Sequence, residues 1–366
     1  MIKRLKISRE FLLTILSLTF LLVSLLSPII IHAQEPKSRT IKEIKINSKT
    51  SLVHLGSIDS FDITEGGVEA GKFLFNALET GNNDSAQAAS KIYDRIIPLE
   101  NYGGEYTALQ WFAKYLLASN SEKEKILADK YHREFFNFWA ENNFANLKEY
   151  IQRKYKLKEF EDGKTFKGQS RISFLEDFIL FNNPRREEWE KTSKIMQVLN
   201  LKPGMRIADI GSGPGYYTFK FSEAVGPNGK VFGIDTVKDH VNFVSKVASK
   251  YKLNNIDFVY LPKADNIGVA ENQVDLAYMC SLYHIIYTVT LQEVQERYLN
   301  SLKKALKPDG RFVVVDNALV EKGTLPYHGP YIAKELVISQ LEQYGFRLEK
   351  EYQFIPQRYI LIFKKA

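Results

Sequence analysis

Residues 208–215 read Ala-Asp-Ile-Gly-Ser-Gly-Pro-Gly, an apolar segment that ends in three alternating glycines. Because Gly211, Gly213 and Gly215 lack a Cβ atom, the backbone can turn sharply out of a strand and lie close to a ligand. The next acidic residue to follow a strand-like segment is Asp235, twenty residues after Gly215. A carboxylate at the tip of a second strand is placed to accept hydrogen bonds from ribose hydroxyls. The stretch therefore predicts a nucleoside-binding turn.

The spacing of the glycines separates two kinds of nucleotide-binding domain. The dinucleotide fingerprint G-x-G-x-x-G requires a glycine at position 216, where this chain has Tyr216. The tail at 346–364 contains two apolar runs split by Pro356, which predicts a closing antiparallel pair of strands. A nicotinamide-dependent oxidoreductase would continue in parallel instead. Both features disfavour that class, which we keep as an alternative.

From residue 187 onward, short apolar segments alternate with helical ones, as in a parallel sheet with helices on both faces. The pattern predicts an α/β domain over 185–366. We expect strands near 205–210, 231–235, 256–260, 273–279 and 310–316. We expect helices near 187–199, 215–225, 238–251, 291–306 and 332–344.

Further motifs lie before and after the glycine turn: Leu-Lys-Pro-Gly at 201–204, Val-Phe-Gly-Ile-Asp at 231–235, Ala264-Asp265, Val-Asp-Leu-Ala-Tyr at 274–278 and Leu-Lys-Pro-Asp-Gly-Arg-Phe-Val-Val-Val-Asp at 306–316. With these motifs in the family's order, the segment 185–366 resembles the class I S-adenosylmethionine-dependent methyltransferases. The resemblance implies a Rossmann-like seven-stranded methyltransferase sheet with helices on both faces, and S-adenosyl-L-methionine as the cofactor. The chain departs from close relatives at Thr192, where they tend to have proline.

The resemblance also implies cofactor-binding roles. It places Asp209 near the ammonium group, Asp235 at the ribose hydroxyls and Asp265 at the adenine amino group, although a strand-end Asp can instead cap the next helix. The backbone of the glycine turn and the following helix start suit the carboxylate of the methionine part. The full predicted set, with Cys280 on the floor of the cleft, is Asp209, Gly211, Ser212, Gly213, Gly215, Asp235, Ala264, Asp265 and Cys280.

His284, just after the fourth strand, is the candidate catalytic residue. An imidazole titrates near neutral pH, so His284 is suited to take a proton from an acceptor hydroxyl. A structural role in packing or hydrogen bonding is the alternative. We expect no metal site, because the other histidines do not pair at metal-ligand spacing and the chain has a single cysteine. Further candidates for the acceptor pocket are Tyr283, Tyr287, His328 and Tyr331.

The class of molecule that accepts the methyl group is predicted by excluding other classes. The chain lacks the Asn/Asp-Pro-Pro-Tyr/Phe motif of amino-methylating nucleic-acid and glutamine enzymes, and the multiple thiols of arsenite methyltransferases. The net charge is +7, of which +3 lies before residue 34, so the charge does not indicate nucleic-acid binding. By analogy with the ubiquinone and menaquinone methyltransferases, a small-molecule or quinone-like acceptor remains. A nonenzymatic S-adenosylmethionine-binding or scaffold protein of the cell envelope is the alternative.

Residues 1–33 have the layout of a secretory signal, with basic residues, an apolar run over 11–31 and the small residue Ala33. The run is also long enough for an uncleaved membrane anchor. We therefore expect an exported protein, or one anchored to the membrane through residues 1–33. Export is in tension with a methyl donor made inside cells, and the basic residues on both sides of the run permit either orientation.

Three segments separate the signal region from the α/β domain. We expect a polar linker at 34–60, a smaller, mainly α-helical domain at 61–160 and a charged linker at 161–184. In the helical domain, Ser121 and Glu124 form a capping-box pattern. An apolar, aromatic stripe at 126–139 predicts a helical core, part of which could cover the active site. The oligomeric state is not predicted by the sequence.

Overall fold

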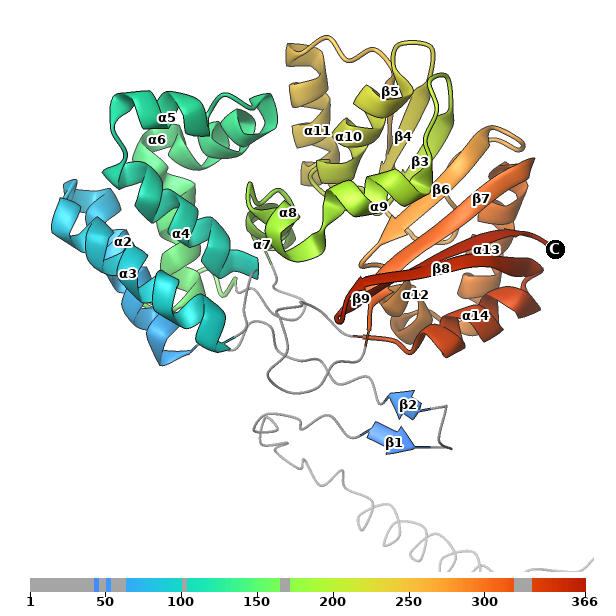
Figure 1. Ribbon diagram of the computed structural model, residues 1–366, viewed down its shortest axis with the longest axis horizontal. Helices are drawn as coiled ribbons and strands as arrows, with labels where there is room; N and C mark the ends of the chain where they lie inside the picture. The colour runs from blue at the N-terminus through green and yellow to red at the C-terminus, as the bar shows by residue number, and fades with distance from the viewer. Residues whose placement is uncertain (1–42, 46–50, 54–63, 101–103, 165–171, 319–330) are drawn as a thin grey trace, which may run out of the picture. The chain divides into compact units, whose positions relative to one another are not determined.

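The computed structural model describes residues 43–45, 51–53, 64–100, 104–164, 172–318 and 331–366 (Figure 1). The predicted signal segment 1–33 lies outside these residues, as does most of the predicted linker 34–60. That linker contains one short antiparallel pair, β1 (Glu43–Lys45) and β2 (Ser51–Val53). The chain divides into two units, Met1–Thr40 and Ile41–Ala366, and every described element belongs to the second. None of the helices within the described ranges is both long and apolar enough to cross a membrane.

The predicted seven-stranded sheet is confirmed, with the strand order β5-β4-β3-β6-β7-β9-β8 (Figure 1). The first five strands in this order are parallel, and β9 runs antiparallel to both of its neighbours. The closing antiparallel pair is therefore also confirmed. The strands are β3 (Arg206–Ile210), β4 (Lys230–Asp235), β5 (Ile256–Tyr260), β6 (Val274–Cys280), β7 (Leu306–Asn317), β8 (Phe346–Ile355) and β9 (Arg358–Lys365).

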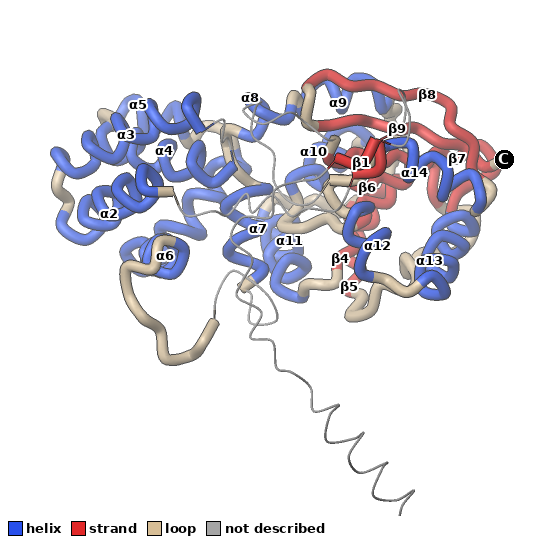
Figure 2. The backbone as a smooth tube through the Cα atoms, turned by 90° about the horizontal axis from the view of Figure 1, so that it is seen from below, coloured by secondary structure: helices blue, strands red, loops and turns tan. Residues whose placement is uncertain are grey.

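Helices cover both faces of this sheet (Figure 2). Alternate residues of a strand point to opposite faces, so each strand contributes to two cores. Ile207 and Val313 pack with α9, α10 and α11, whereas the next residues, Ala208 and Val314, pack with α12, α13 and α14. The first group of helices is α9 (Thr192–Leu199), α10 (Tyr216–Val225) and α11 (Lys238–Lys250), and the second is α12 (Tyr283–Val289), α13 (Gln292–Ala305) and α14 (Lys334–Gln343).

Two helical details differ from the prediction. The helix expected at 187–199 is two helices, α8 (Arg186–Glu190) and α9, because Lys191 between them adopts a left-handed conformation with a φ of 58°. Helix α12 was not predicted at all. Its seven residues are too few to show a helical period beside the apolar strand that precedes them.

The described part of the predicted helical region forms five helices, and their core also includes residues of a helix at 173–181. The core contains Leu74, Tyr93, Phe112 and Trp139, which are almost completely buried. The backbone leaves the helical conformation at 141–144 within α6 (Lys130–Lys154). The helices are α2 (Glu65–Thr80), α3 (Asn83–Glu100), α4 (Gly104–Leu117), α5 (Asn120–Ile126) and α6 (Lys130–Lys154).

The capping box lies two residues before the predicted one. Ser119, not Ser121, is the N-cap of α5, and its hydroxyl accepts a hydrogen bond from the Glu122 amide. The Glu122 carboxylate accepts one from the Ser119 amide at 2.8 Å. Ser121 and Glu124 have the same sequence spacing, so the pattern alone could not distinguish the two pairs.

The predicted linker 161–184 contains a helix, α7 (Ser173–Phe181). Phe178 at its centre is fully buried, and its ring centroid lies 4.6 Å from that of Phe138 on α6 and 4.7 Å from that of Phe243 on α11. Helix α7 is therefore packed on two sides. Six of its nine residues are apolar, and a segment this short and apolar cannot be told from a buried strand by its pattern alone.

Phe178→Ala is expected to destabilise the protein strongly, because it removes a ring that fills space between α6 and α11. Large-to-small changes of this kind cost about 3–5 kcal/mol. Urea unfolding followed by circular dichroism measures the change. The matched control is Phe73→Ala on α2, which is 37% exposed and should change the free energy of unfolding by less than about 1 kcal/mol. Equal losses for the two variants would contradict the packing role of Phe178.

Candidate active site

A cavity of about 610 Å³ opens at the carboxyl ends of β3, β4 and β6. β4 and β5 lie on one side of β3, and β6 and β7 lie on the other, so the order of strands reverses at this point. Ligands of open α/β sheets bind at such a switch point. The strand-end residues that line the cavity are 209–213, 234–237 and 280–282.

The glycine turn lies against this cavity in a left-handed conformation that favours glycine. Gly211 and Gly213 have φ values of +69° and +53°. A Cβ atom on Gly211 would come within 2.5 Å of Leu282 Cδ2, whereas one on Gly213 would have no neighbour within 4 Å. Gly215 has another role, because it is the N-cap of α10 and is not among the lining residues. A Cβ atom there would lie 2.8 Å from Phe219 and from Val244.

The Asp235 carboxylate is held by three contacts at the end of β4. Oδ2 accepts a hydrogen bond from the Gly213 amide at 2.7 Å, and Oδ1 accepts one from the Val237 amide at 2.8 Å. Nδ1 of His240 lies 3.1 Å from Oδ1. The carboxylate is thus oriented before any ligand arrives, and it both lines the cavity and fixes the glycine turn.

Asp209 lies at the end of β3, is 3% exposed and lines the same cavity. Burial raises the pKa of its carboxyl to about 7. The hydrogen bond from Thr218 Oγ1 to Oδ2, 2.5 Å long, opposes the rise, and the negative charge of Asp235 adds to it. Asp209 can therefore exchange a proton near neutral pH, and it becomes a better partner for a cation as it ionises.

The loop after β5 presents different residues from those predicted. Ala264 lines the cavity as expected, but Asp265 does not, and the neighbouring Asn266 lines it instead. The Asp265 carboxylate accepts a hydrogen bond from Asn266 Nδ2 at 2.7 Å. Neighbouring residues of a loop point in different directions. A motif match places the loop but does not determine which of its side chains faces the cavity.

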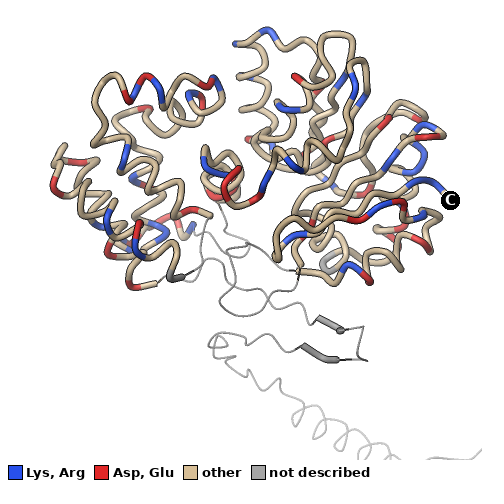
Figure 3. Tube along the Cα trace, in the orientation of Figure 1, with Lys and Arg blue, Asp and Glu red and all other residues tan. Residues whose placement is uncertain are grey.

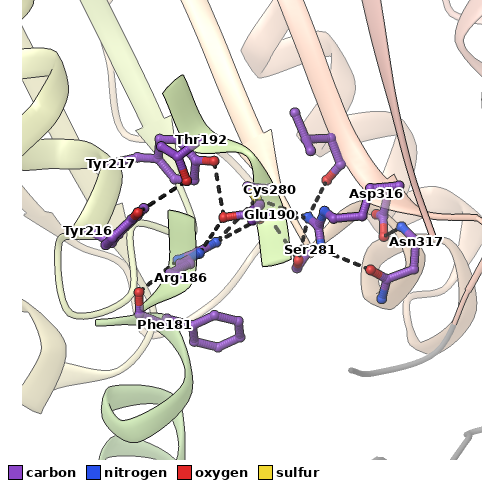
Figure 4. Close-up of polar contacts among 12 residues, drawn as sticks. Phe181, Arg186, Glu190, Thr192, Tyr216, Tyr217, Cys280, Ser281, Asp316 and Asn317 are labelled. Carbon is purple, nitrogen blue, oxygen red and sulfur yellow. Dashed lines mark hydrogen bonds and ion pairs between the residues drawn. The ribbon is translucent and has the colours of Figure 1, made fainter. Parts of the chain in front are cut away.

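Cys280 belongs to a buried polar cluster that the sequence analysis did not identify (Figure 4). Its Sγ lies 3.1 Å from Arg358 Nη2 and 3.6 Å from Glu190 Oε1. Glu190 also pairs with Arg186, whose Nη2 is 3.0 Å from Oε1. Burial raises the pKa of the Cys280 thiol to about 11, and the Glu190 carboxylate adds to this effect. The thiol therefore stays protonated near neutral pH, and it lines the cavity.

Two arginines keep Glu190 ionised although it is 1% exposed. Burial alone would raise the pKa of its carboxyl, but the charges of Arg186 and Arg358 outweigh burial and lower the pKa to about 2. Arg186 comes from α8 and Arg358 from β9, so the cluster joins two segments that are far apart in the sequence. No local pattern distinguishes these residues from the many exposed charges of the chain, so the sequence carried no signal for them.

His284 lies in the first turn of α12, is 2% exposed and lines the cavity. Its Nδ1 is 2.6 Å from Asp316 Oδ1, and its backbone amide donates to Asp316 Oδ2 at 3.0 Å. Burial alone would raise the pKa of Asp316, but His284 and the Asn317 amide hold the pKa below its usual value. Asp316 at the end of β7 therefore orients the imidazole, and only its position at a strand end indicated such a role beforehand.

Helix α7 supplies one wall of the cavity, which the sequence analysis also missed. The wall residues follow the i, i+3, i+4 spacing of a single helical face. Of the residues predicted for the acceptor pocket, Tyr283 and Tyr331 are fully buried elsewhere, Tyr287 is not in the lining, and His328 lies outside the described residues. The α7 residues that line the cavity are Ser173, Glu176, Asp177, Leu180 and Phe181.

Charged residues of both signs are mixed along the described part of the chain, and its acidic, His and Cys side chains do not gather into a metal-binding group. Lys and Arg residues are interspersed with Asp and Glu along the described helices and strands (Figure 3). In the same part of the chain, no group of three or more His, Cys, Asp or Glu side chains has the geometry to hold a metal ion. The expectation from the sequence that the protein has no metal site stays a prediction.

Asp209→Asn is expected to flatten the dependence of stability on pH. Because the folded-state pKa of Asp209 is about 7, the folded protein retains a proton that the unfolded chain loses above about pH 4. The contribution of this group to the free energy of unfolding is therefore greatest below about pH 4 and declines up to about pH 7. We expect the variant to be more stable than the wild type at pH 8 by on the order of 2 kcal/mol, with a smaller difference at pH 5.

Urea unfolding at a series of pH values measures this effect. Asp265→Asn is the matched control, because Asp265 lies outside the cavity. A pH dependence that is the same in the wild type and in Asp209→Asn would contradict the proton uptake assigned to Asp209.

Comparisons with known proteins agree with this geometry. A family model described as a methyltransferase domain matches residues 201–343. A probable cobalt-precorrin-6B C(15)-methyltransferase (decarboxylating) of Sulfurisphaera tokodaii is 30% identical over 199 residues, which cover 51% of this chain and 93% of the relative. A ubiquinone/menaquinone biosynthesis C-methyltransferase of Shewanella frigidimarina is 29% identical over 175 residues, which cover 47% of this chain and 59% of the relative.

Among solved structures, a SAM-dependent methyltransferase from Aquifex aeolicus is 26% identical, with a TM-score of 0.43, and the match covers 50% of this chain and 94% of that one. The precorrin relative is matched over nearly its whole length. The residues that match the family model, 201–343, contain the glycine turn and the end of β4. The oxidoreductase and the nonenzymatic scaffold are therefore set aside. The chain belongs to the class I S-adenosylmethionine-dependent methyltransferases, and its cofactor is S-adenosyl-L-methionine.

Proposed function

We propose that this methyltransferase acts on a small molecule that binds in the cavity between α7 and His284. The observation that carries the proposal is the cavity wall beyond the strand ends, which presents apolar and aromatic side chains such as Leu180, Phe181 and Ile285. Small-molecule sites are concave and mostly apolar, with a few placed polar groups. The names of the precorrin and the ubiquinone/menaquinone relatives also describe small-molecule substrates.

The residues of the strand ends fit the cofactor. Gly213 lines the cavity, and a Cβ atom on it would point into open space, so this position leaves room for a ligand against the backbone. We assign the ribose hydroxyls to Asp235, whose carboxylate is already oriented, and the ammonium group to Asp209. Asn266 replaces Asp265 as the polar group near the adenine. The bound cofactor supplies a methyl group on a sulfonium, and alignment of this group with the acceptor accounts for much of the catalysis.

His284 is the proposed proton acceptor for the incoming substrate. When Nδ1–H donates to Asp316 Oδ1, Nε2 is the basic nitrogen of the neutral ring. The ionised Asp316 carboxylate also stabilises the imidazolium that forms when the ring takes a proton. Because His284 lines the cavity, its imidazole can contact a substrate that binds there.

A labelling experiment tests the class of acceptor. The full chain is incubated with S-adenosylmethionine that carries a tritiated methyl group, together with a small-molecule extract, total RNA or total protein from cells. The proposal predicts that label enters the small-molecule fraction. Label that enters only RNA or protein, or no fraction at all, overturns it.

His284→Gln is expected to lower kcat about 100-fold, because general-base catalysis contributes a factor of that order. The dissociation constant of S-adenosylmethionine, measured by calorimetry, should change by less than about threefold, since His284 is assigned to the acceptor and not to the cofactor. The control is Asp235→Ala, which should abolish binding of the cofactor. An unchanged kcat in His284→Gln would leave His284 with a purely structural role.

We also propose that residues 1–33 act as an export signal or a membrane anchor. The support is the basic and apolar pattern of that segment. Cell fractionation compares the full chain with a version that begins at residue 34. The full chain should be found in the membrane or exported fraction and the shorter one in the cytosol, and a cytosolic location for both would contradict the proposal.

A further inference from the structure

His240 on α11 lies between the cofactor site and the wall formed by α7. Its side chain is almost completely buried, and its ring centroid is 5.7 Å from that of Phe174 on α7. Nδ1 is 3.1 Å from Asp235 Oδ1, and Nε2 is 3.4 Å from Asp177 Oδ2. One imidazole thus contacts the carboxylate assigned to the ribose and a carboxylate of α7.

A second contact joins α7 to the cofactor site. Asn182, the C-cap of α7, donates a hydrogen bond from Nδ2 to the Pro214 carbonyl at 2.8 Å. Pro214 lies in the glycine turn, which is itself fixed to Asp235 through the Gly213 amide. The end and the middle of α7 therefore contact the two segments that hold the cofactor.

The same helix faces the acceptor side of the cavity through Leu180 and Phe181. Helix α7 precedes the residues 201–343 that match the family model. It is therefore an element outside the matched part of the chain, and it contacts both the region where the acceptor is proposed to bind and the cofactor-binding segments.

We propose that His240 is a positioning residue that couples cofactor binding to the docking of α7, and through α7 to binding of the acceptor. The proposal rests on the assignment of Asp235 to the ribose. When α7 is docked, Phe174 packs against the His240 ring and Asp177 lies beside its Nε2. The ring in turn helps to hold Asp235 in the rotamer that accepts the ribose hydroxyls. The cofactor therefore binds the docked state more tightly, and it shifts the population toward that state.

Because such coupling is reciprocal, an acceptor that contacts Leu180 and Phe181 should also strengthen cofactor binding. Coupling of this kind typically changes an affinity by about 5- to 150-fold. The direction of the effect follows from the geometry: loss of the His240 link should weaken the response of α7 to the cofactor, while Asp235 keeps its bonds to the Gly213 and Val237 amides.

Hydrogen exchange of the full chain, with and without S-adenosylhomocysteine, tests the coupling through peptides that cover α7. In the wild type, the ligand should slow exchange in 173–181 by about tenfold. Two variants of His240 each remove a different one of the two contacts that the ring makes. His240→Asn places an amide near the position of Nδ1 and loses the reach to Asp177, whereas His240→Gln reaches toward Asp177 and loses the short contact to Asp235.

His240→Asn should still bind S-adenosylhomocysteine, within about threefold of the wild-type affinity, but the slowing of exchange in α7 should be lost. His240→Gln should weaken binding by about tenfold. The matched control is His132→Asn on α6, a histidine that is not in the cavity lining and should change neither quantity. If His240→Asn does not fold, Asp177→Ala removes the same contact from the other side.

The outcomes separate the two proposals. Equal slowing of exchange in α7 for the wild type and His240→Asn, when both bind the ligand, overturns the coupling and leaves the cofactor site intact. A folded wild type that does not bind S-adenosylhomocysteine overturns the cofactor-site assignment, and the coupling falls with it.

Discussion

The hydrogen bond from the Gly213 amide to the Asp235 carboxylate is the constraint on which the rest of the site depends. It joins the ends of β3 and β4, which are paired in parallel from Arg206 to Ile210, so both strands deliver their residues to the same edge of the sheet. The left-handed conformation of Gly213 allows its amide to point at Asp235. The bond closes the glycine turn around a cavity and orients the carboxylate that faces it.

The buried charges beside this turn connect it to the end of the chain. A buried ion pair is stabilising only when its charges are fully paired, and removal of one partner is costly. Glu190 pairs with Arg186 and Arg358, and Arg358 also donates to Asn317 Oδ1 and Ser281 Oγ (Figure 4). The antiparallel tail of the sheet therefore does more than close the fold, because β9 supplies a charge that holds α8 and the end of β6 together.

Helix α7 gives the site a wall that lies outside the segment matched by the family model, residues 201–343. Phe178 places the helix between α6 and α11, and Asn182 and Asp177 place it beside the glycine turn and His240. One face of the helix is thus used for packing and the other for the cavity. The identity of the acceptor is expected to depend on this second face, since the strand ends are occupied by residues assigned to the cofactor.

The sequence by itself determined the class of fold, the cofactor and the positions of Asp209, Asp235 and the glycine turn, because these features have fixed spacing along a few strands and turns. Only the tertiary structure decided that Asn266 and not Asp265 lines the cavity, that Asp316 orients His284, and that α7 forms a wall. It also revealed the buried pairing of Glu190 with its arginines. These contacts join residues from separate elements, and their geometry depends on how helices pack on the sheet, which no local spacing in the sequence specifies.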